Sequence, residues 1–211
     1  MLKQFVALFL VLGSLHSFAQ EVGFSSVSNV PDLKTKIQNT HKNSKTVKSL
    51  FTQEKHLSFM QDKVTSKGIF QLKHPGKMRI EYTSPFAYLV IINGEKIMVK
   101  DGKKVTKIDT RTDKSFRQLN EVLTHSLNGE IDNIKGFEAQ FLQSKDYYLV
   151  NLTPSEAGMK DLFDKIKIYL DHTTLQVAKL DLLEKSGDVT KMKFEQIQTN
   201  VAIPDETFVA R

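Results

Sequence analysis

From residue 46 onward, apolar and polar residues alternate with a period of two, and short turn sequences interrupt the alternation. A period of two matches the pleat of a half-buried strand, whereas a helix repeats its faces every three to four residues. Two of the interruptions, Asn93-Gly94 and Asp101-Gly102, supply the positive φ that two-residue hairpins require. Residues 87–109 are therefore expected to form an antiparallel meander.

Eleven segments of the chain fit this description of a strand, and most are joined by short turns. They are residues 46–58, 64–73, 77–83, 87–92, 95–100, 103–109, 136–143, 147–153, 163–170, 175–184 and 189–199. Consecutive hairpins curl into a complete or partial barrel rather than a parallel α/β sheet. The sequence thus predicts a mainly β (α+β) fold.

Two amphipathic helices are expected beside these strands. The first begins near Asn29 and ends near Asn43, with a capping residue, a proline in the first turn and apolar residues at helical spacing. The second interrupts the sheet over 113–129, and a short turn or helix is expected over 154–160. The apolar stripe of the second helix contains Phe116, Leu119, Leu123 and Leu127.

Residues 1–19 have the pattern of a secretory signal peptide. Lys3 precedes an apolar run over 5–15, and small residues stand at 17 and 19, where a signal peptidase reads the chain. A transmembrane anchor is the alternative, but the run is shorter than the roughly 20 residues that span a bilayer. We expect cleavage after Ala19 and one exported domain over 20–211.

Composition and motifs exclude most catalytic classes. The chain has no Cys, which removes a disulfide framework, thiolate metal sites, a thiol nucleophile and an N-terminal lipid anchor. The histidines do not pair at metal-ligand spacing, and no nucleophile elbow, phosphate loop or dinucleotide fingerprint occurs. We therefore expect no metal, no cofactor and no enzymatic activity, and favour noncatalytic binding.

One face of nearly every expected strand carries large apolar side chains. The plain interpretation is a packed barrel core. A wide or open sheet cannot fill its own interior, however, so the helix over 113–129 would then cover an apolar concavity suited to a lipid or another lipophile. The residues expected to line this face are Phe51, Phe70, Leu72, Met78, Ile80, Tyr82, Tyr88, Val90, Ile97 and Val99.

A run of lysines straddles two of the expected hairpins. Such lysines protect an exposed sheet edge against aggregation, or they form an electrostatic patch for an acidic partner or an anionic membrane surface. Nucleic acid is not expected as a partner, because the aromatic residues alternate inward instead of interleaving with the lysines. The run consists of Lys96, Lys100, Lys103, Lys104 and Lys107.

Residues 47–102 resemble the LolA family of periplasmic lipoprotein carriers. The resemblance rests on Phe51-Thr52-Gln53, on a strand that ends in a basic-Pro-Gly turn at 73–76, and on an Arg-containing strand that ends at Tyr82. A proline at 85 then precedes an apolar strand that closes in Asn93-Gly94.

The resemblance implies an unclosed barrel of about eleven antiparallel strands with an apolar concave face under lid helices. Its cargo would be the acyl chains of lipoproteins, in transit between the inner and the outer membrane. It also implies an inner-membrane lipoprotein-releasing transporter and an outer-membrane acceptor as partners, and we expect a monomer in the periplasm. Met78, Ile80 and Tyr82 match positions that line the family's cavity, and Met suits varied acyl shapes.

One position departs from the family pattern. Enterobacterial carriers have an Arg before the turn proline, where it ties the lid helices shut, and this chain has His74. Imidazole is shorter and offers fewer donors, so His74 is either a weaker, pH-dependent lid latch or a plain turn residue. Arg79 could substitute, but its alternation places it on the opposite face.

Two other functions remain compatible with these features. One is a related carrier for another lipid or lipophile in a dedicated export pathway. The other is a lipoprotein-sensing module of an envelope-stress regulator, whose N-terminal domain shares this half-barrel.

Overall fold

The computed structural model of the chain describes residues 21–109, 111 and 134–209. The expected signal peptide lies outside the described residues. So does nearly all of the expected helix over 113–129, including Phe116, Leu119 and Leu123.

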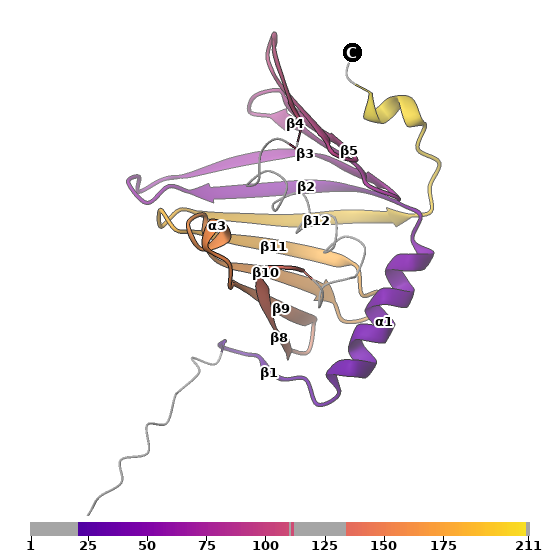
Figure 1. Ribbon diagram of the computed structural model, residues 1–211, viewed down its shortest axis with the longest axis vertical. Helices are drawn as coiled ribbons and strands as arrows, with labels where there is room; N and C mark the ends of the chain where they lie inside the picture. Colours follow the sequence, from indigo (N-terminus) through magenta and orange to yellow (C-terminus); the bar gives the residue numbers. More distant parts are fainter. Residues whose placement is uncertain (1–20, 110, 112–133, 210–211) are drawn as a thin grey trace, which may run out of the picture.

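In the described residues, twelve strands form one sheet in which every neighbouring pair is antiparallel (Figure 1). Their order is β1-β8-β9-β10-β11-β12-β2-β3-β4-β5-β6-β7, so β1 and β7 are the two edges and the barrel is unclosed. The strands are β1 (Ser25–Ser26), β2 (Thr46–His56), β3 (Lys63–Lys73), β4 (Lys77–Ser84), β5 (Tyr88–Asn93), β6 (Lys96–Asp101), β7 (Lys104–Asp109), β8 (Phe137–Gln143), β9 (Tyr147–Pro154), β10 (Phe163–Asp171), β11 (Val177–Glu184) and β12 (Val189–Thr199).

Each of the eleven expected segments corresponds to one of these strands, with bounds that agree to within two residues. The additional strand, β1, has only two residues and pairs with Gln143 and Leu142 of β8, too short a stretch to show a period. The expected strand over 175–184 begins at Val177 instead, because Leu175 has a φ of 57° and ends the preceding turn. The short helix expected over 154–160 is α3 (Ala157–Lys160).

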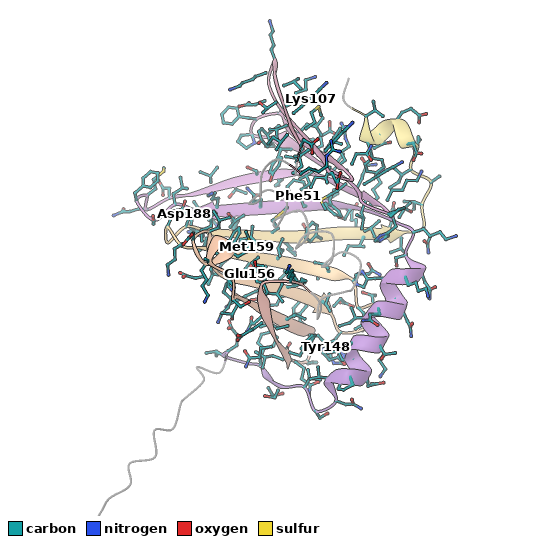
Figure 2. The ribbon with its side chains drawn as sticks, viewed as in Figure 1. Phe51, Lys107, Tyr148, Glu156, Met159 and Asp188 are labelled. Atoms are coloured by element: carbon teal, nitrogen blue, oxygen red, sulfur yellow. The ribbon has the colours of Figure 1, made fainter. Side chains whose placement is uncertain are left out.

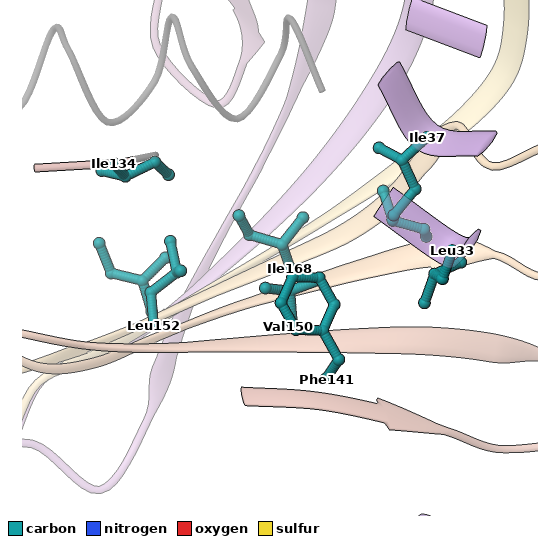
Figure 3. Packing of buried hydrophobic residues seen from close by; sticks show 9 residues of the cluster. Leu33, Ile37, Ile134, Phe141, Val150, Leu152 and Ile168 are labelled. Atoms are coloured by element: carbon teal, nitrogen blue, oxygen red, sulfur yellow. The ribbon is translucent and has the colours of Figure 1, made fainter. Parts of the chain in front are cut away.

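Helix α1 (Val30–Asn43) forms for the local reasons that its sequence indicates. The side chain of Asn29 accepts a hydrogen bond from the backbone N–H of Asp32 at 3.1 Å, and a proline occupies the first turn. Leu33 and Ile37, one helical turn apart, are 4% and 1% exposed. They pack onto side chains of β8 to β10, as Figure 3 shows for Val150 and Ile168.

The C-terminal segment crosses to the other face of the sheet. Residues 201–208, which end in the 3-10 helix η1 (Asp205–Phe208), pack on Ile91 and Met98 of β5 and β6. The buried side chains of this segment are Ile203 and Phe208. Since Ile91 and Met98 alternate with inward-facing residues, this segment covers the outer face. Lys73 and Lys77 hold it through Asp205, with Nζ–Oδ1 distances of 2.7 and 3.1 Å.

Candidate functional site: the apolar concave face of β2 to β6

The antiparallel register aligns the inward side chains of β2 to β6 in three rows that run across the strands. Alternation alone places these residues on one face, and the pairing of neighbouring strands determines which of them are adjacent. The first row is Leu72, Met78, Ile92 and Ile97; the second is Phe70, Ile80, Val90 and Val99; the third is Phe51, Gly68, Tyr82 and Tyr88.

All ten residues that the sequence assigns to the cavity therefore lie in these rows, and nine of them belong to one apolar cluster. The tenth, Tyr88, contacts that cluster through Tyr82, at 5.7 Å between ring centroids. The structure thus brings the predicted residues together on one continuous face.

The first row is buried throughout, whereas the second and third rows are buried at Phe70 and Phe51 and only half-buried on β4 to β6. Leu72 and Met78 of the first row are buried, at 4% and 3% exposed. Ile80 and Val90 of the second row and Tyr82 of the third are only half-buried. On β4 to β6 the face is therefore sealed near the turn at 74–76 and more accessible toward the opposite strand ends.

The third row depends on a close approach at Gly68. A Cβ added there would lie 2.1 Å from the carbonyl oxygen of Glu81 and 2.7 Å from the ring of Phe51, so the ring occupies the space over the glycine. The Phe51 ring also meets that of Tyr82 edge-on, with 5.0 Å between centroids. In Figure 2 Phe51 lies near the middle of the sheet.

The polar groups of this region keep the face uncharged. Tyr82 donates its hydroxyl to the side-chain oxygen of Gln53 at 2.8 Å, and burial raises the pKa of this hydroxyl. The other residues named in the three rows are apolar, apart from Tyr88 with its phenolic tip, and on β2 the buried hydroxyl of Ser49 is in register with Phe70. Such a surface can bind hydrocarbon.

The turn residue His74 joins two parts of the fold. Its backbone N–H donates to the carbonyl of Lys45, which ties the β3–β4 turn to the link between α1 and β2. In the same turn, the Gly76 carbonyl accepts a hydrogen bond from the Gly94 N–H at 2.9 Å. The lid that His74 was expected to latch lies outside the described residues, so the latch stays a prediction.

Arg79 lies on the outer face, as its alternation predicts. Its guanidinium donates to the Thr207 carbonyl at 3.2 Å and forms an ion pair with Glu81 at 3.0 Å. Arg79 therefore fastens the C-terminal segment and has no access to the concave face.

Other residues of the same cluster were not assigned to the site from the sequence. Met192 and Phe194 of β12 belong to it because β12 pairs with β2, with Phe194 opposite Phe51. Leu180 of β11 packs against this cluster and also against the cluster under α1. The alternation of 189–199 was visible in the sequence, but the pairing of the last strand with the first long one was not.

The described residues contain no group of three or more side chains suited to a metal ion. None of the described helices combines the length and apolar character needed to cross a membrane. The lysine run lies on the β6–β7 hairpin, and β7 is an edge of the sheet. Edge protection is consistent with this position.

Comparison with known proteins gives consistent results. The outer membrane lipoprotein carrier protein LolA family matches residues 42–211 of the chain. An outer-membrane lipoprotein carrier protein of Dechloromonas aromatica is 28% identical over 168 residues, which cover 79% of this chain and 77% of the relative. A protein of the same description from Francisella philomiragia is 26% identical over 189 residues, 89% of this chain and 86% of the relative.

A solved structure shares the fold at low identity. The crystal structure of a DUF1329 family protein from Desulfovibrio piger superposes with a TM-score of 0.50 at 14% identity. The match covers 84% of this chain and 95% of that one.

Proposed function

Because this chain belongs to the LolA family of outer membrane lipoprotein carrier proteins, we propose that it binds lipoprotein acyl chains on the concave face of β2 to β6. It carries them through the periplasm from an inner-membrane lipoprotein-releasing transporter to an outer-membrane acceptor. Export through a signal peptide cleaved after Ala19 is part of this proposal. Binding and release require no covalent chemistry.

The observation that carries the proposal is the incomplete burial of the second and third rows on β4 to β6. An ordinary core would bury all of its large apolar side chains, but Ile80, Val90 and Val99 are half-buried although they point inward. Acyl chains that cover such a surface gain about 25 cal/mol for each Å² removed from water. The site residues proposed for the cargo are Phe51, Phe70, Leu72, Met78, Ile80, Tyr82, Tyr88, Val90, Ile97 and Val99.

A carrier must also release its cargo, which limits how tightly the face can bind. The unbranched thioether of Met78 adapts to different acyl shapes without a fixed fit. The expected lid residues Phe116, Leu119 and Leu123 would compete with the cargo for the same face, with His74 as the proposed latch. That competition lowers the net binding free energy and keeps the transfer reversible.

The test is mass spectrometry of the protein purified from a native periplasm, with two matched variants. Ile80→Thr places a hydroxyl on the proposed site, and Leu182→Thr places one on the half-buried rim of the cluster under α1. We expect wild type and Leu182→Thr to carry acylated lipoprotein, and Ile80→Thr to carry several-fold less.

Each outcome of this experiment distinguishes one function from another. Acylated lipoprotein on the wild-type protein supports the carrier function. Recovery of a free lipid without lipoprotein would instead indicate a carrier of another export pathway. A wild-type protein that holds neither would contradict the proposal.

A further inference from the structure

The two ends of the sheet differ in what they expose. The antiparallel pairing places five connections at one end, here called the loop end: residues 57–62, 85–87, 102–103, 155–162 and 185–188. Asp188, at the left in Figure 2, marks this end, which lies away from α1. The turns at 74–76, 94–95 and 172–176 lie at the other end, here called the helix end.

The loop end displays apolar side chains to solvent. Nine large apolar side chains are exposed in the described residues, and six of them lie in the loop end or within two residues of it. Phe59 and Phe86 are 79% and 81% exposed, whereas the turns of the helix end contain no exposed large apolar residue among those described. Scattered single residues need no explanation, but this concentration at one end marks an interaction surface.

The loop that carries Phe59 is held in place by hydrogen bonds. The backbone N–H of Ser58 donates to the Asp188 carboxylate at 2.8 Å, and that of Met60 donates to the Leu57 carbonyl at 2.9 Å. These bonds fix the backbone on both sides of Phe59, so its ring is presented to solvent by an ordered turn.

The charges around Phe86 are predominantly positive. Lys67 is paired in register with Ser84, next to this loop, and Lys103 and Lys104 form the adjacent β6–β7 turn. Asp101, the last residue of β6, is the acidic residue beside that turn. The other loops of the loop end carry both signs, with Asp62, Glu156, Asp161 and Asp188 against Lys160 and Lys185. Aromatic side chains beside lysines are typical of proteins that insert apolar tips into the boundary of an anionic bilayer.

We propose that the loop end docks on the surface of an anionic phospholipid bilayer, with Phe59 and Phe86 inserted among the lipids and Lys67, Lys103 and Lys104 against the headgroups. The proposal goes beyond the proposed carrier function and rests on that function. The half-buried row of Tyr82 and Tyr88 leads directly into the loop of Phe86, so the open part of the concave face would meet the membrane.

The experiment is cosedimentation of the purified protein, free of cargo, with sucrose-loaded vesicles. One vesicle type contains phosphatidylethanolamine and phosphatidylglycerol, and the other contains phosphatidylcholine alone. The variants are Phe59→Ser/Phe86→Ser and Lys103→Gln/Lys104→Gln, with Val22→Ser as the control, because Val22 is 96% exposed and lies outside the loop end. Thermal unfolding checks that each variant is folded. Substitutions at exposed positions such as these are expected to change stability little.

We expect the wild type and Val22→Ser to bind the anionic vesicles, and the double Phe variant to bind at least about tenfold more weakly. The double Lys variant should lose affinity for anionic vesicles only, and its binding should depend less on salt. A wild type that binds no vesicles, or a folded double Phe variant that binds as well as the wild type, would overturn the proposal. Equal binding to both vesicle types would overturn its electrostatic part.

The outcome is separable from that of the carrier function, because the vesicle experiment uses no cargo. A double Phe variant that still carries lipoprotein in the periplasm but fails to bind vesicles would support docking at the loop end. A protein that binds vesicles yet never carries cargo would contradict the carrier function alone.

Discussion

The two halves of the concave face are built from the same alternating sequence and reach different degrees of closure. Under α1, Val150, Leu152 and Leu170 are fully buried, and Ile166 and Ile168 are 1% exposed. Across β2 to β6, the equivalent inward positions of the second and third rows are largely half-buried. Similar strand patterns can therefore build a sealed core in one half and a more accessible surface in the other.

Among the described residues, different elements pack on the two halves. Leu33 and Ile37 of α1 pack on side chains of β8 to β10. In the β2 to β6 half, the C-terminal segment packs on the outer face, and we propose that acyl chains cover the inner one. We infer that the first half supplies stability and the second supplies binding.

The largest expected effect is a loss of stability that is greater in the sealed half than in the other. Leu152→Ala removes a fully buried side chain and should lower the free energy of unfolding by about 2–5 kcal/mol. Ile80→Ala should lower it by about 1 kcal/mol, because that side chain is already partly in water. Chemical denaturation measures both values, and equal losses would remove the distinction between the halves.

A smaller effect is expected at the close approach that supports the third row. Gly68→Ala forces a Cβ against the Glu81 carbonyl and the Phe51 ring, and should lower the free energy of unfolding by about 1–3 kcal/mol. Lys67→Ala, at the neighbouring exposed position, should change it by less than about 0.5 kcal/mol. If urea unfolding found the two variants equally stable, the packing of Phe51 over Gly68 would not matter to the fold.

The smallest effect concerns pH and the C-terminal segment behind the binding half. Hydrogen bonds from Lys73 and Lys77 hold the pKa of Asp205 below its ordinary value. A carboxyl group with a lowered folded-state pKa stabilises the fold above its unfolded pKa, near 3.9, and loses this as the pH falls through the folded value.

The segment should therefore loosen slightly as the pH falls below about 4, and Asp205→Asn should be equally loose at neutral pH. The NMR signals of Phe208 report on the contact, since its ring is 2% exposed. An acid-induced change in Asp205→Asn as large as in the wild type would show that this carboxylate is not responsible.

Much of the fold follows from local sequence signals. Turn dipeptides such as Asn93-Gly94 end strands because glycine accepts positive φ, here 59° at Gly94, and period-two alternation assigns a face to each residue. The same alternation correctly separates Arg79 on the outer face from Met78 and Ile80 on the inner one. The ten positions predicted to line a cavity could thus be placed on one face from the sequence.

What the sequence does not reveal depends on contacts between distant segments. Phe194 joins the site only because β12 pairs with β2, and Ile203 and Phe208 anchor the C-terminal segment only because β5 and β6 are apolar on both faces. The degree of burial is equally invisible, since Leu152 and Ile80 have the same pattern around them. Alternation predicts which way a side chain points, while its exposure depends on what packs above it.

The most direct test of the different roles of the two halves is site-specific photocrosslinking in a native periplasm. A photoreactive phenylalanine analogue replaces Val90, on the proposed site, or Leu182, on the rim of the sealed half. We predict adducts with acylated lipoprotein from position 90 and at most traces from position 182. Adducts from 182 alone, or equally from both positions, would contradict the assignment of binding to the β2 to β6 half.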